Sequence, residues 1–330
     1  MEFRLIERLQ ALTAQARDDV RLGIGDDAAL LAVPAGQELA VAIDTLVEGV
    51  HFPVGTAPAD IGWKALAVNL SDLAAMGATP AWALLALTLP ARPLQAQQER
   101  VDGLASGFAQ LARTHGVALV GGDTTRGPFA LSVAVHGFVP PGQALRRDGA
   151  RVGDLVFVTG TLGDAAAGLQ RLGTAADPDE EKRRVVLRAR LNRPEPRVAA
   201  GLALRRRASA CIDVSDGLVA DLGHVCTASG VGAELEASSL PLSSALLGCC
   251  DELAARDHAL SGGDYSELCF TVPPARAGEL QADLARLGCG ATRIGRIVAG
   301  AGVRVRGEDG QWQVPGRAGW DHFPDETLPG

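Results

Sequence analysis

The residues most suited to chemistry in this sequence are aspartates that directly follow apolar runs. Asp44 closes the run ELAVAID, Asp123 closes VALVGGD, and Asp213 and Asp216 stand in ACIDVSDG. We expect each run to be a strand that ends beside its acid, and open α/β sheets bind ligands at strand ends. Carboxylates converging on one cleft repel one another unless cations bridge them. Hard oxygen ligands suit Mg²⁺ or Ca²⁺, and Mg²⁺ usually also binds substrate phosphates.

Glycine-containing turns carry further acids. Asp26 and Asp27 lie in GIGDDAA, Asp264 lies in SGGDYS, and Asp72 falls on the helix expected after Asp44. An Asx turn or a helix cap explains any one of these aspartates as well as a metal site does. That ordinary explanation is weaker for the whole set, because turn aspartates need not follow apolar strands so regularly.

Two segments have the composition of phosphate-binding turns. In VGGDTT, Gly121 and Gly122 permit a close backbone approach and positive φ, although a plain tight turn also explains them. In DVSDG, a helix that starts at Asp216 would make Ser215 its N-cap and its N-terminus an anion site, or simply a capped helix. No lysine follows a glycine, which excludes a P-loop, and no G-x-G-x-x-G follows an expected strand.

The composition restricts the class of partner. The 330 residues carry a net charge of −8 and only 4% aromatic side chains, which argues against coating nucleic acid or anionic lipid. Lys64 and Lys182 are the only lysines. The six cysteines start at Cys211 and form no C-x-x-C pair, so a zinc site or a disulfide framework is not expected. Without an apolar signal segment or a run of about 20 apolar residues, we expect a cytoplasmic protein.

The elements that must position the acids alternate between strand and helix. The first half reads as helices at 1–17, 60–77 and 94–115 and strands at 38–44, 81–89, 117–123 and 129–139, with Asp60 and Gly77 as the N-cap and stop of the second helix. The second half reads as strands at 154–160, 264–272, 291–298 and 302–306, a strand and turn at 210–217, and helices at 218–230 and 276–287. The charged residues at 175–184 predict a solvated loop or the start of a helix. Proline, glycine and charge coincide in 140–154, which predicts two α/β (α+β) domains, 1–140 and 150–330.

Eight motifs, in this order, resemble the thiamine-monophosphate kinase family: GIGDDAA, AIDTLVEGVHF, GWKALAVNLSDLAAMGATPAWALL, VGGDTT, RRDGARVGD, VTGTLGDAAAGL, IDVSDGLVADL and GWDHF. That family belongs to the superfamily of aminoimidazole ribonucleotide synthetase and selenophosphate synthetase. The resemblance covers roughly residues 20 to 323. The run from Asp44 to Leu85 is highly specific, whereas DVSDG and GGD are common to the wider superfamily.

The resemblance implies a fold and an activity. The fold would be an N-terminal sheet that pairs with the sheet of a dimer mate into a barrel, followed by a C-terminal mixed α/β domain that completes the substrate site. The N-terminal domain would bind ATP and Mg²⁺ and form the homodimer. The reaction would be direct, in-line transfer of the ATP γ-phosphoryl group to thiamine monophosphate with several Mg²⁺ ions. The product would be thiamine diphosphate.

Matching motifs also assign expected roles to residues. The metal ligands would be Asp27, Asp44, Asp72, Asp123, Asp213 and Asp216. The ATP contacts would be Gly122, Asp123, Arg147 and Ser215, and the substrate contacts would be His51, Asp264 and Trp320. More ordinary explanations are a packing histidine, an exposed linker arginine and a tryptophan of the C-terminal core.

Two positions depart from the family pattern. The family commonly has Gly-Gly-Glu/Asp-Asp-Tyr where this chain has Gly-Gly-Asp264-Tyr265-Ser266, so a second acid is missing. The pair before Asp44 often bears hydroxyls but is Ala42-Ile43 here, which leaves backbone carbonyls or Thr45 as further metal ligands. Two alternatives stay open. One is a non-catalytic protein that binds nucleotide or thiamine phosphate, and the other is an ATP-dependent enzyme like selenophosphate synthetase, whose reactive N-terminal cysteine this chain lacks.

Overall fold

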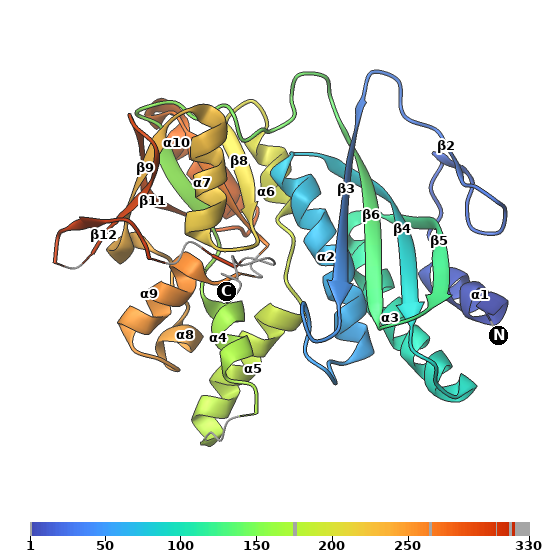
Figure 1. The fold of residues 1–330 in the computed structure, drawn as a ribbon. Helices are drawn as coiled ribbons and strands as arrows, with labels where there is room; N and C mark the ends of the chain where they lie inside the picture. The colour runs from blue at the N-terminus through green and yellow to red at the C-terminus, as the bar shows by residue number, and fades with distance from the viewer. Residues whose placement is uncertain (1, 174–176, 264–265, 308, 317–318, 321–330) are drawn as a thin grey trace, which may run out of the picture. The chain divides into compact units, whose positions relative to one another are not determined.

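The chain forms two compact units, both of mixed strand and helix, in agreement with the predicted two-domain α/β class (Figure 1). The computed structural model describes residues 2–173, 177–263, 266–307, 309–316 and 319–320. The first unit is Met1–Leu145 with Asn192–Arg206, and the second is Arg146–Leu191 with Arg207–Gly330. The segment Asn192–Arg206 thus packs with the first unit, although it lies within the range 150–330.

A four-stranded sheet organises the first unit. Its order is β3 (Glu38–Val47), β6 (Ala130–Val139), β4 (Thr79–Leu89) and β5 (Ala118–Arg126). The pairs β3–β6 and β6–β4 are antiparallel, whereas β4 and β5 are parallel and are connected by a helix. Strands β1 (Val20–Leu22) and β2 (Leu30–Leu31) form a separate antiparallel pair. Strands β3 and β5 are therefore the two edges of the main sheet.

Four helices accompany this sheet: α1 (Glu2–Thr13), α2 (Pro58–Ala75), α3 (Leu94–His115) and α6 (Val198–Leu204). Helix α2 packs against β3 and β6 and against α3 and α6, while α1 lies against α3 and β5. Helices α2 and α3 approach closely, since a Cβ on Gly107 would lie 1.7 Å from the Ala59 carbonyl oxygen. The N-cap of α2 is Ala57, so the expectation for Asp60 is wrong: Pro58 starts the helix, and Asp60 lies in its first turn.

Two strand ends differ from the prediction. Strand β3 continues to Val47 and β5 to Arg126, so Asp44 and Asp123 lie inside their strands. The extra residues are held by backbone pairing with β6 and β4. Both are edge strands, where polar side chains can meet solvent without breaking the ladder. The prediction holds for Asp213, which is the penultimate residue of β8 (Ala210–Val214).

The second unit contains a seven-stranded sheet in the order β13-β12-β9-β11-β7-β10-β8. The remaining strands are β7 (Leu155–Thr159), β9 (Gly232–Glu236), β10 (Glu267–Val272), β11 (Ala291–Val298), β12 (Gly302–Arg306) and β13 (Trp312–Gln313). Its helices are α4 (Asp164–Gln170), α5 (Pro178–Asn192), α7 (Leu218–Ser229), the 3₁₀ turn η1 (Ala237–Ser239), α8 (Ser244–Leu247), α9 (Glu252–Ser261) and α10 (Pro274–Arg286). Side chains from α7 and from strands β7, β8 and β11 share one buried core.

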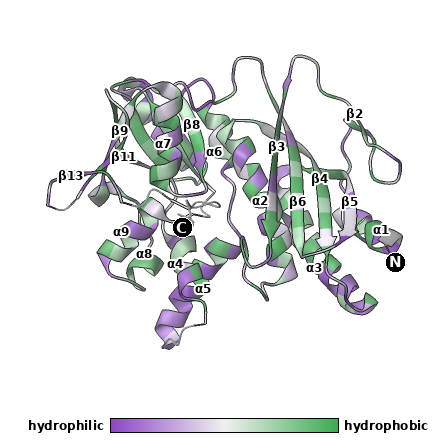
Figure 2. Cartoon of the chain, viewed as in Figure 1, coloured by the Kyte–Doolittle hydropathy of each residue, from purple (hydrophilic) through white to green (hydrophobic). Residues whose placement is uncertain are grey.

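Helix α5 is a strongly polar helix of the second unit. Figure 2 shows α5 as largely hydrophilic, and only Arg184, Leu187 and Leu191 of this helix are buried. Its first residues are acidic and its later residues basic, which supports a helix through its dipole and through side-chain pairs one turn apart. Among the helices that the structure describes, none is long and apolar enough to cross a membrane.

Candidate active site

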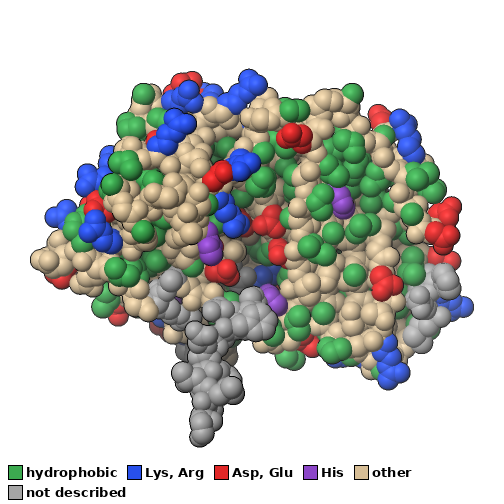
Figure 3. All heavy atoms as spheres, turned by 45° about the horizontal axis from the view of Figure 1, so that its top comes forward, with side chains coloured by type: hydrophobic (Ala, Val, Ile, Leu, Met, Phe, Trp, Pro, Cys, Tyr) green, Lys and Arg blue, Asp and Glu red, His purple; other side chains and the backbone are tan. Residues whose placement is uncertain are grey.

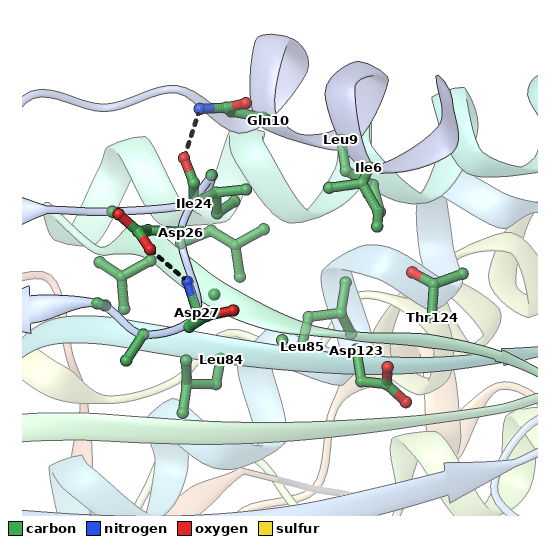
Figure 4. Close-up of a pocket in the computed structure, with 18 of the residues that line it drawn as sticks. Ile6, Leu9, Gln10, Ile24, Asp26, Asp27, Leu84, Leu85, Asp123 and Thr124 are labelled. Carbon is green, nitrogen blue, oxygen red and sulfur yellow. Dashed lines mark hydrogen bonds between the residues drawn. The ribbon is translucent and has the colours of Figure 1, made fainter. Parts of the chain in front are cut away.

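A pocket of about 1020 Å³ lies in the first unit, between the turn that contains Asp26 and Asp27, helix α1 and the β5 side of the sheet (Figure 4). Leu84 and Leu85 of β4 line it, together with Gly122 and Asp123 of β5, Thr124 and His136. Three of the residues predicted from the sequence, Asp27, Gly122 and Asp123, are therefore brought into one cavity. The cavity combines carboxylates with apolar walls, as small-molecule sites commonly do.

The two adjacent acids of the turn have different surroundings. The Asp27 backbone N–H donates to Asp26 Oδ1 at 2.8 Å, so the Asp26 carboxylate braces the turn. The Gln10 side-chain amide donates to the Ile24 carbonyl oxygen at 2.9 Å and ties the turn to α1 (Figure 4). The Asp26 carboxylate is thus engaged by the backbone of the turn, and both Asp26 and Asp27 line the pocket.

Gly122 occupies a position where any side chain would be strained. Its φ is 149°, and a Cβ there would lie 1.9 Å from the Leu85 carbonyl oxygen of the neighbouring strand. The tight-turn alternative for Gly121 and Gly122 is wrong, because both residues lie inside β5. The glycine allows β5 to pair closely with β4 just before Asp123, and this fixes the place of that acid at the pocket.

Strand register places Thr45 in one row with Asp123. Thr45 pairs with Ser132, Ser132 with Ala86, and Ala86 with Asp123. The hydroxyls of Thr45 and Ser132 are 2.7 Å apart. Side chains in one row of a sheet share a face, so Thr45 and Asp123 lie on the same side of the sheet at its two edges.

Asp44 lies on the opposite face. It pairs with Val133, which is fully buried, and its backbone N–H donates to Asn69 Oδ1 of α2 at 3.0 Å. Asp72 lies one turn further along α2, on the side of the helix that carries Asn69. Among the described residues, no three His, Cys, Asp or Glu side chains of either unit come close enough to hold a metal ion. The predicted ligands of the first unit therefore form two groups, one at the pocket and one beside α2.

His51 lies in a turn that a buried lysine supports. The Val47 N–H donates to His51 Nδ1 at 3.1 Å, and Lys64 Nζ donates to the His51 carbonyl oxygen at 3.0 Å. Lys64 is only 3% exposed, on α2. Because Nδ1 accepts a hydrogen bond, the neutral ring carries its proton on Nε2 and offers a donor there.

In the second unit, the loop after β8 carries Ser215 and Asp216. Helix α7 begins at Leu218 with Gly217 as its N-cap, so Ser215 does not cap the helix. Asp221 Oδ2 accepts instead from the backbone N–H groups of Ser215, Asp216 and Gly217 at 3.0, 3.1 and 3.1 Å. These three loop amides are therefore already satisfied by a carboxylate of the chain itself.

Asp221 shares its surroundings with two other acids. Burial is the main cause that raises the pKa of Asp221 to about 7, and the carboxylates of Asp213 and Asp216 raise it further. The hydrogen bonds from Gly217 and Ser215 oppose these effects because they stabilise the charged form. Asp213 itself is buried at the end of β8, whereas Ser215 is exposed.

Trp320 lies directly beside this loop. Its backbone N–H donates to the Asp216 carbonyl oxygen at 2.9 Å, and a Cβ on Gly319 would lie 2.6 Å from the same oxygen. Trp320 is 53% exposed, so packing in the C-terminal core does not account for it. Gly263 approaches the loop as well, since a Cβ there would lie 2.5 Å from the Ser215 carbonyl oxygen. The next residue, Asp264, falls outside the described residues.

Arg147 is held at the other end of α7. Ser229, the last residue of the helix, donates its hydroxyl to the Arg147 carbonyl oxygen at 2.8 Å. Helix α7 has 12 residues, so about 18 Å separates this contact from the Ser215 end. The side chain of Arg147 is exposed, while the neighbouring Arg146 pairs with Asp148. Within the second unit, Arg147 and Ser215 are therefore not adjacent.

Three residues of these sites were not found from the sequence: Lys64, Asn69 and Asp221. Each acts on backbone groups, and such contacts leave little trace in a sequence pattern. A usable signal was present for Lys64, a lone charge in the apolar run GWKALAVNL, and for Asp221, an acid in the first turn of an expected helix.

Comparison with known proteins identifies both halves of the chain. The model of the N-terminal domain of AIR synthase related proteins matches residues 25–139, and the model of their C-terminal domain matches residues 151–308. The thiamine-monophosphate kinase of Salmonella typhimurium is 46% identical over 322 residues, which cover 98% of each chain. The thiamine-monophosphate kinase of Haemophilus influenzae is 41% identical over 330 residues, again 98% of each chain.

Solved structures agree with these relatives. The crystal structure of thiamine-monophosphate kinase from Stenotrophomonas maltophilia has a TM-score of 0.85 and 51% identity, and the match covers 94% of this chain and 98% of that one. AaThiL complexed with AMPPCP and TMP has a TM-score of 0.77 and 33% identity, with 98% and 97% covered. The hydrogenase maturation protein HypE of Escherichia coli, at 23% identity and a TM-score of 0.75, shares the fold. The chain belongs to the thiamine-monophosphate kinase family.

Proposed function

We infer that this protein transfers the γ-phosphoryl group of ATP to the phosphate of thiamine monophosphate, which yields thiamine diphosphate and ADP. Relatives named for this activity match nearly the whole chain, and AaThiL binds AMPPCP, an ATP analogue, together with TMP. The observation that carries the inference is the placement of the motif residues. Asp27, Gly122 and Asp123 line one cavity, and Asp213, Ser215 and Asp216 share one strand end and loop.

We propose Mg²⁺ as the metal, because the donor set fits it. The pocket supplies the carboxylates of Asp27 and Asp123, β8 supplies that of Asp213 and the loop after β8 that of Asp216, and carboxylate oxygens are ligands that Mg²⁺ prefers. Asp44, Thr45 and Asp72 complete the proposed ligand set. Bound Mg²⁺ would offset the negative charge of two anionic substrates and of the transferring group. The chain itself can supply little of that positive charge through lysine, since it has only two.

The side chains contribute positioning rather than covalent chemistry. Gly122 and Asp123 of the pocket, Ser215 and Arg147 would contact ATP, with Ser215 and Arg147 at different parts of the nucleotide because α7 separates them, and His51 would donate Nε2–H to the substrate. Trp320 would pack on the thiamine rings, where its indole face favours a cationic thiazolium. Asp264 belongs to the same proposal. Such a site suits direct in-line transfer, in which alignment and charge stabilisation lower the barrier.

We also propose that two copies pair through β3 into a barrel. This edge strand exposes Leu39, Val41 and Ile43 by 43%, 58% and 66%, on the face opposite Asp44. Hydrophobic side chains gather on the half of Figure 3 that holds the first unit. A long apolar edge strand is a ready template for pairing with another strand, and a second copy would cover it. The cytoplasmic location is likewise a proposal, drawn from the sequence.

A product assay tests the activity. Purified protein with ATP, Mg²⁺ and thiamine monophosphate should form thiamine diphosphate and ADP in equal amounts, as followed by chromatography, and EDTA should stop the reaction. Tight binding of both ligands without product over hours would contradict the inference and favour a binding protein. Rapid-quench labelling with γ-³²P ATP tests direct transfer, since a stable phosphoenzyme on the path would exclude it.

A further inference from the structure

One buried carboxylate holds the backbone of the entire loop that follows β8. Asp221 is 3% exposed, and its Oδ2 accepts hydrogen bonds from three consecutive backbone N–H groups, those of Ser215, Asp216 and Gly217. Helix α7 has no N-cap side chain, and Asp221, in its first turn, reaches back to the amides that precede the helix.

The remaining contacts of the loop also involve its backbone, and they leave the Ser215 side chain exposed to solvent. The Trp320 N–H holds the Asp216 carbonyl oxygen, and the Gly263 and Gly319 backbones lie so close that a Cβ on either would collide with the loop. The exposed part is the Ser215 side chain, with the Asp216 side chain half-buried next to it. The hydrogen bonds and the close backbone contacts together fix the conformation of the loop. They therefore also fix the positions of the Ser215 and Asp216 side chains.

We propose that Asp221 is a positioning residue for phosphoryl transfer, which holds Ser215 and Asp216 in the conformation that binds Mg²⁺ and nucleotide. This inference rests on the proposed function. Asp221 acts through the loop amides and does not itself contact substrate. A loss of its carboxylate leaves three donors without their acceptor, and unsatisfied backbone donors are unfavourable, so the loop would rearrange to reach water.

The competing explanation is that Asp221 only stabilises the fold and has no effect on ligand binding. A control substitution at another buried carboxylate distinguishes the two explanations. Glu234 is another buried carboxylate of the second unit, and it pairs with Arg296 and Arg304 away from the loop. Glu234→Gln should lower the melting temperature and leave nucleotide binding unchanged. Asp221→Ala should also lower the melting temperature, but in addition it should weaken binding of Mg²⁺·AMPPCP by about 10–100-fold, as loss of a supporting contact does at metal sites.

The experiment measures Mg²⁺·AMPPCP affinity by calorimetry, half-saturating Mg²⁺ and kcat, at a temperature where all variants are folded. Asp221→Asn keeps one side-chain acceptor oxygen, so it can still hold part of the loop backbone. Its loss of affinity should therefore lie between wild type and Asp221→Ala. A folded Asp221→Ala protein with wild-type affinity and Mg²⁺ dependence would overturn the inference. If Asp221→Ala does not fold, an Asp221→Asn protein that binds Mg²⁺·AMPPCP as tightly as wild type would overturn the inference.

The readouts also separate this inference from the proposed function. If the wild-type protein binds Mg²⁺·AMPPCP but forms no thiamine diphosphate, the proposed function fails while the comparison of affinities still decides the role of Asp221. If wild type and Asp221→Ala form thiamine diphosphate with equal kcat and equal nucleotide affinity, the proposed function stands and only the role of Asp221 fails.

Discussion

Asp26 and Asp27 show how much the role of an acid depends on its backbone contacts. Both line the same pocket, yet the Asp26 carboxylate accepts the N–H of its neighbour and so belongs to the turn. The same contrast recurs in the second unit, where Asp221 faces three backbone amides and Asp213 closes a strand. Two acids that look alike in a sequence can therefore bind a ligand or hold the loop that binds it.

This difference predicts unequal effects of matched substitutions in the turn. Asp27→Asn removes a charge that the proposed site uses for metal, so kcat/KM should fall by about 10²–10³-fold, the scale of losing one electrostatic contact in an active site. Asp26→Asn keeps the acceptor oxygen of the turn, so the fall should be less than tenfold. Steady-state assays of the two variants, with circular dichroism to confirm folding, check the contrast. Equal losses would show that Asp27 has no special role.

At the same scale, the sequence predicted the acids better than the residues that hold them. Asp213 and Asp216 were expected to bind metal, Ser215 to contact ATP and Trp320 to contact the substrate. The structure places Asp213 near the end of β8, Ser215 and Asp216 in the loop after it, and the Trp320 N–H on the Asp216 carbonyl oxygen. The role of Asp221 was not predicted, because its partners are backbone amides. These amides point toward its carboxylate only once the turn has formed. Thr45 and Asp123 fall in one row, but Asp44 and Thr45 point to opposite faces because side chains alternate along a strand.

At the scale of elements, the sequence predicted the ends of helices correctly where a proline or a glycine marks them. Helix α3 spans Leu94–His115 as predicted, between Pro93 and the left-handed Gly116. Strands β3 and β5 run past their acids because pairing continues, which no local pattern reveals. For 175–184 the sequence predicts only a charged loop or a helix start, because the helix found there, α5 (Pro178–Asn192), buries so little apolar surface.

The pairing of β5 with β4 yields a prediction for two adjacent glycines. Gly122→Ala places a Cβ 1.9 Å from a main-chain oxygen at positive φ, so it should destabilise the protein by about 2–4 kcal/mol and disturb Asp123. Gly121→Ala meets only the Leu84 side chain, at 3.0 Å, and should be tolerated better. Thermal unfolding and thiamine diphosphate formation measure both effects. A Gly122→Ala protein as stable and active as Gly121→Ala would contradict the close approach.

At the scale of the whole molecule, the sequence predicted two units of mixed α/β type but not which unit each segment joins. Asn192–Arg206 packs with the first unit, although it follows α5 of the second. Its Pro194 carbonyl oxygen accepts the Trp63 indole N–H at 2.8 Å, and Arg205 donates to Phe138 O. Contacts so distant in sequence have no local signal, which is why a single cut at 140–154 was expected.

The proposed pairing of two copies can be tested at the exposed strand. Ile43→Asp puts a charge in the middle of the β3 apolar row, where burial without a partner costs several kcal/mol, so the protein should run as a monomer in light scattering. Leu253→Asp, on the exposed face of α9, is the control and should leave the assembly unchanged. A wild-type monomer, or an Ile43→Asp dimer, would exclude this surface as the interface.

The burial of Lys64 has a practical consequence for labelling chemistry. Of the two lysines, Lys64 is 3% exposed and donates to a carbonyl in the His51 turn, whereas the Lys182 side chain is 78% exposed on α5. An amine-selective ester reacts with deprotonated, accessible amines, so among the lysines it should modify Lys182 and spare Lys64. A fluorophore could thus be attached to one known side chain of the native protein without engineering a cysteine.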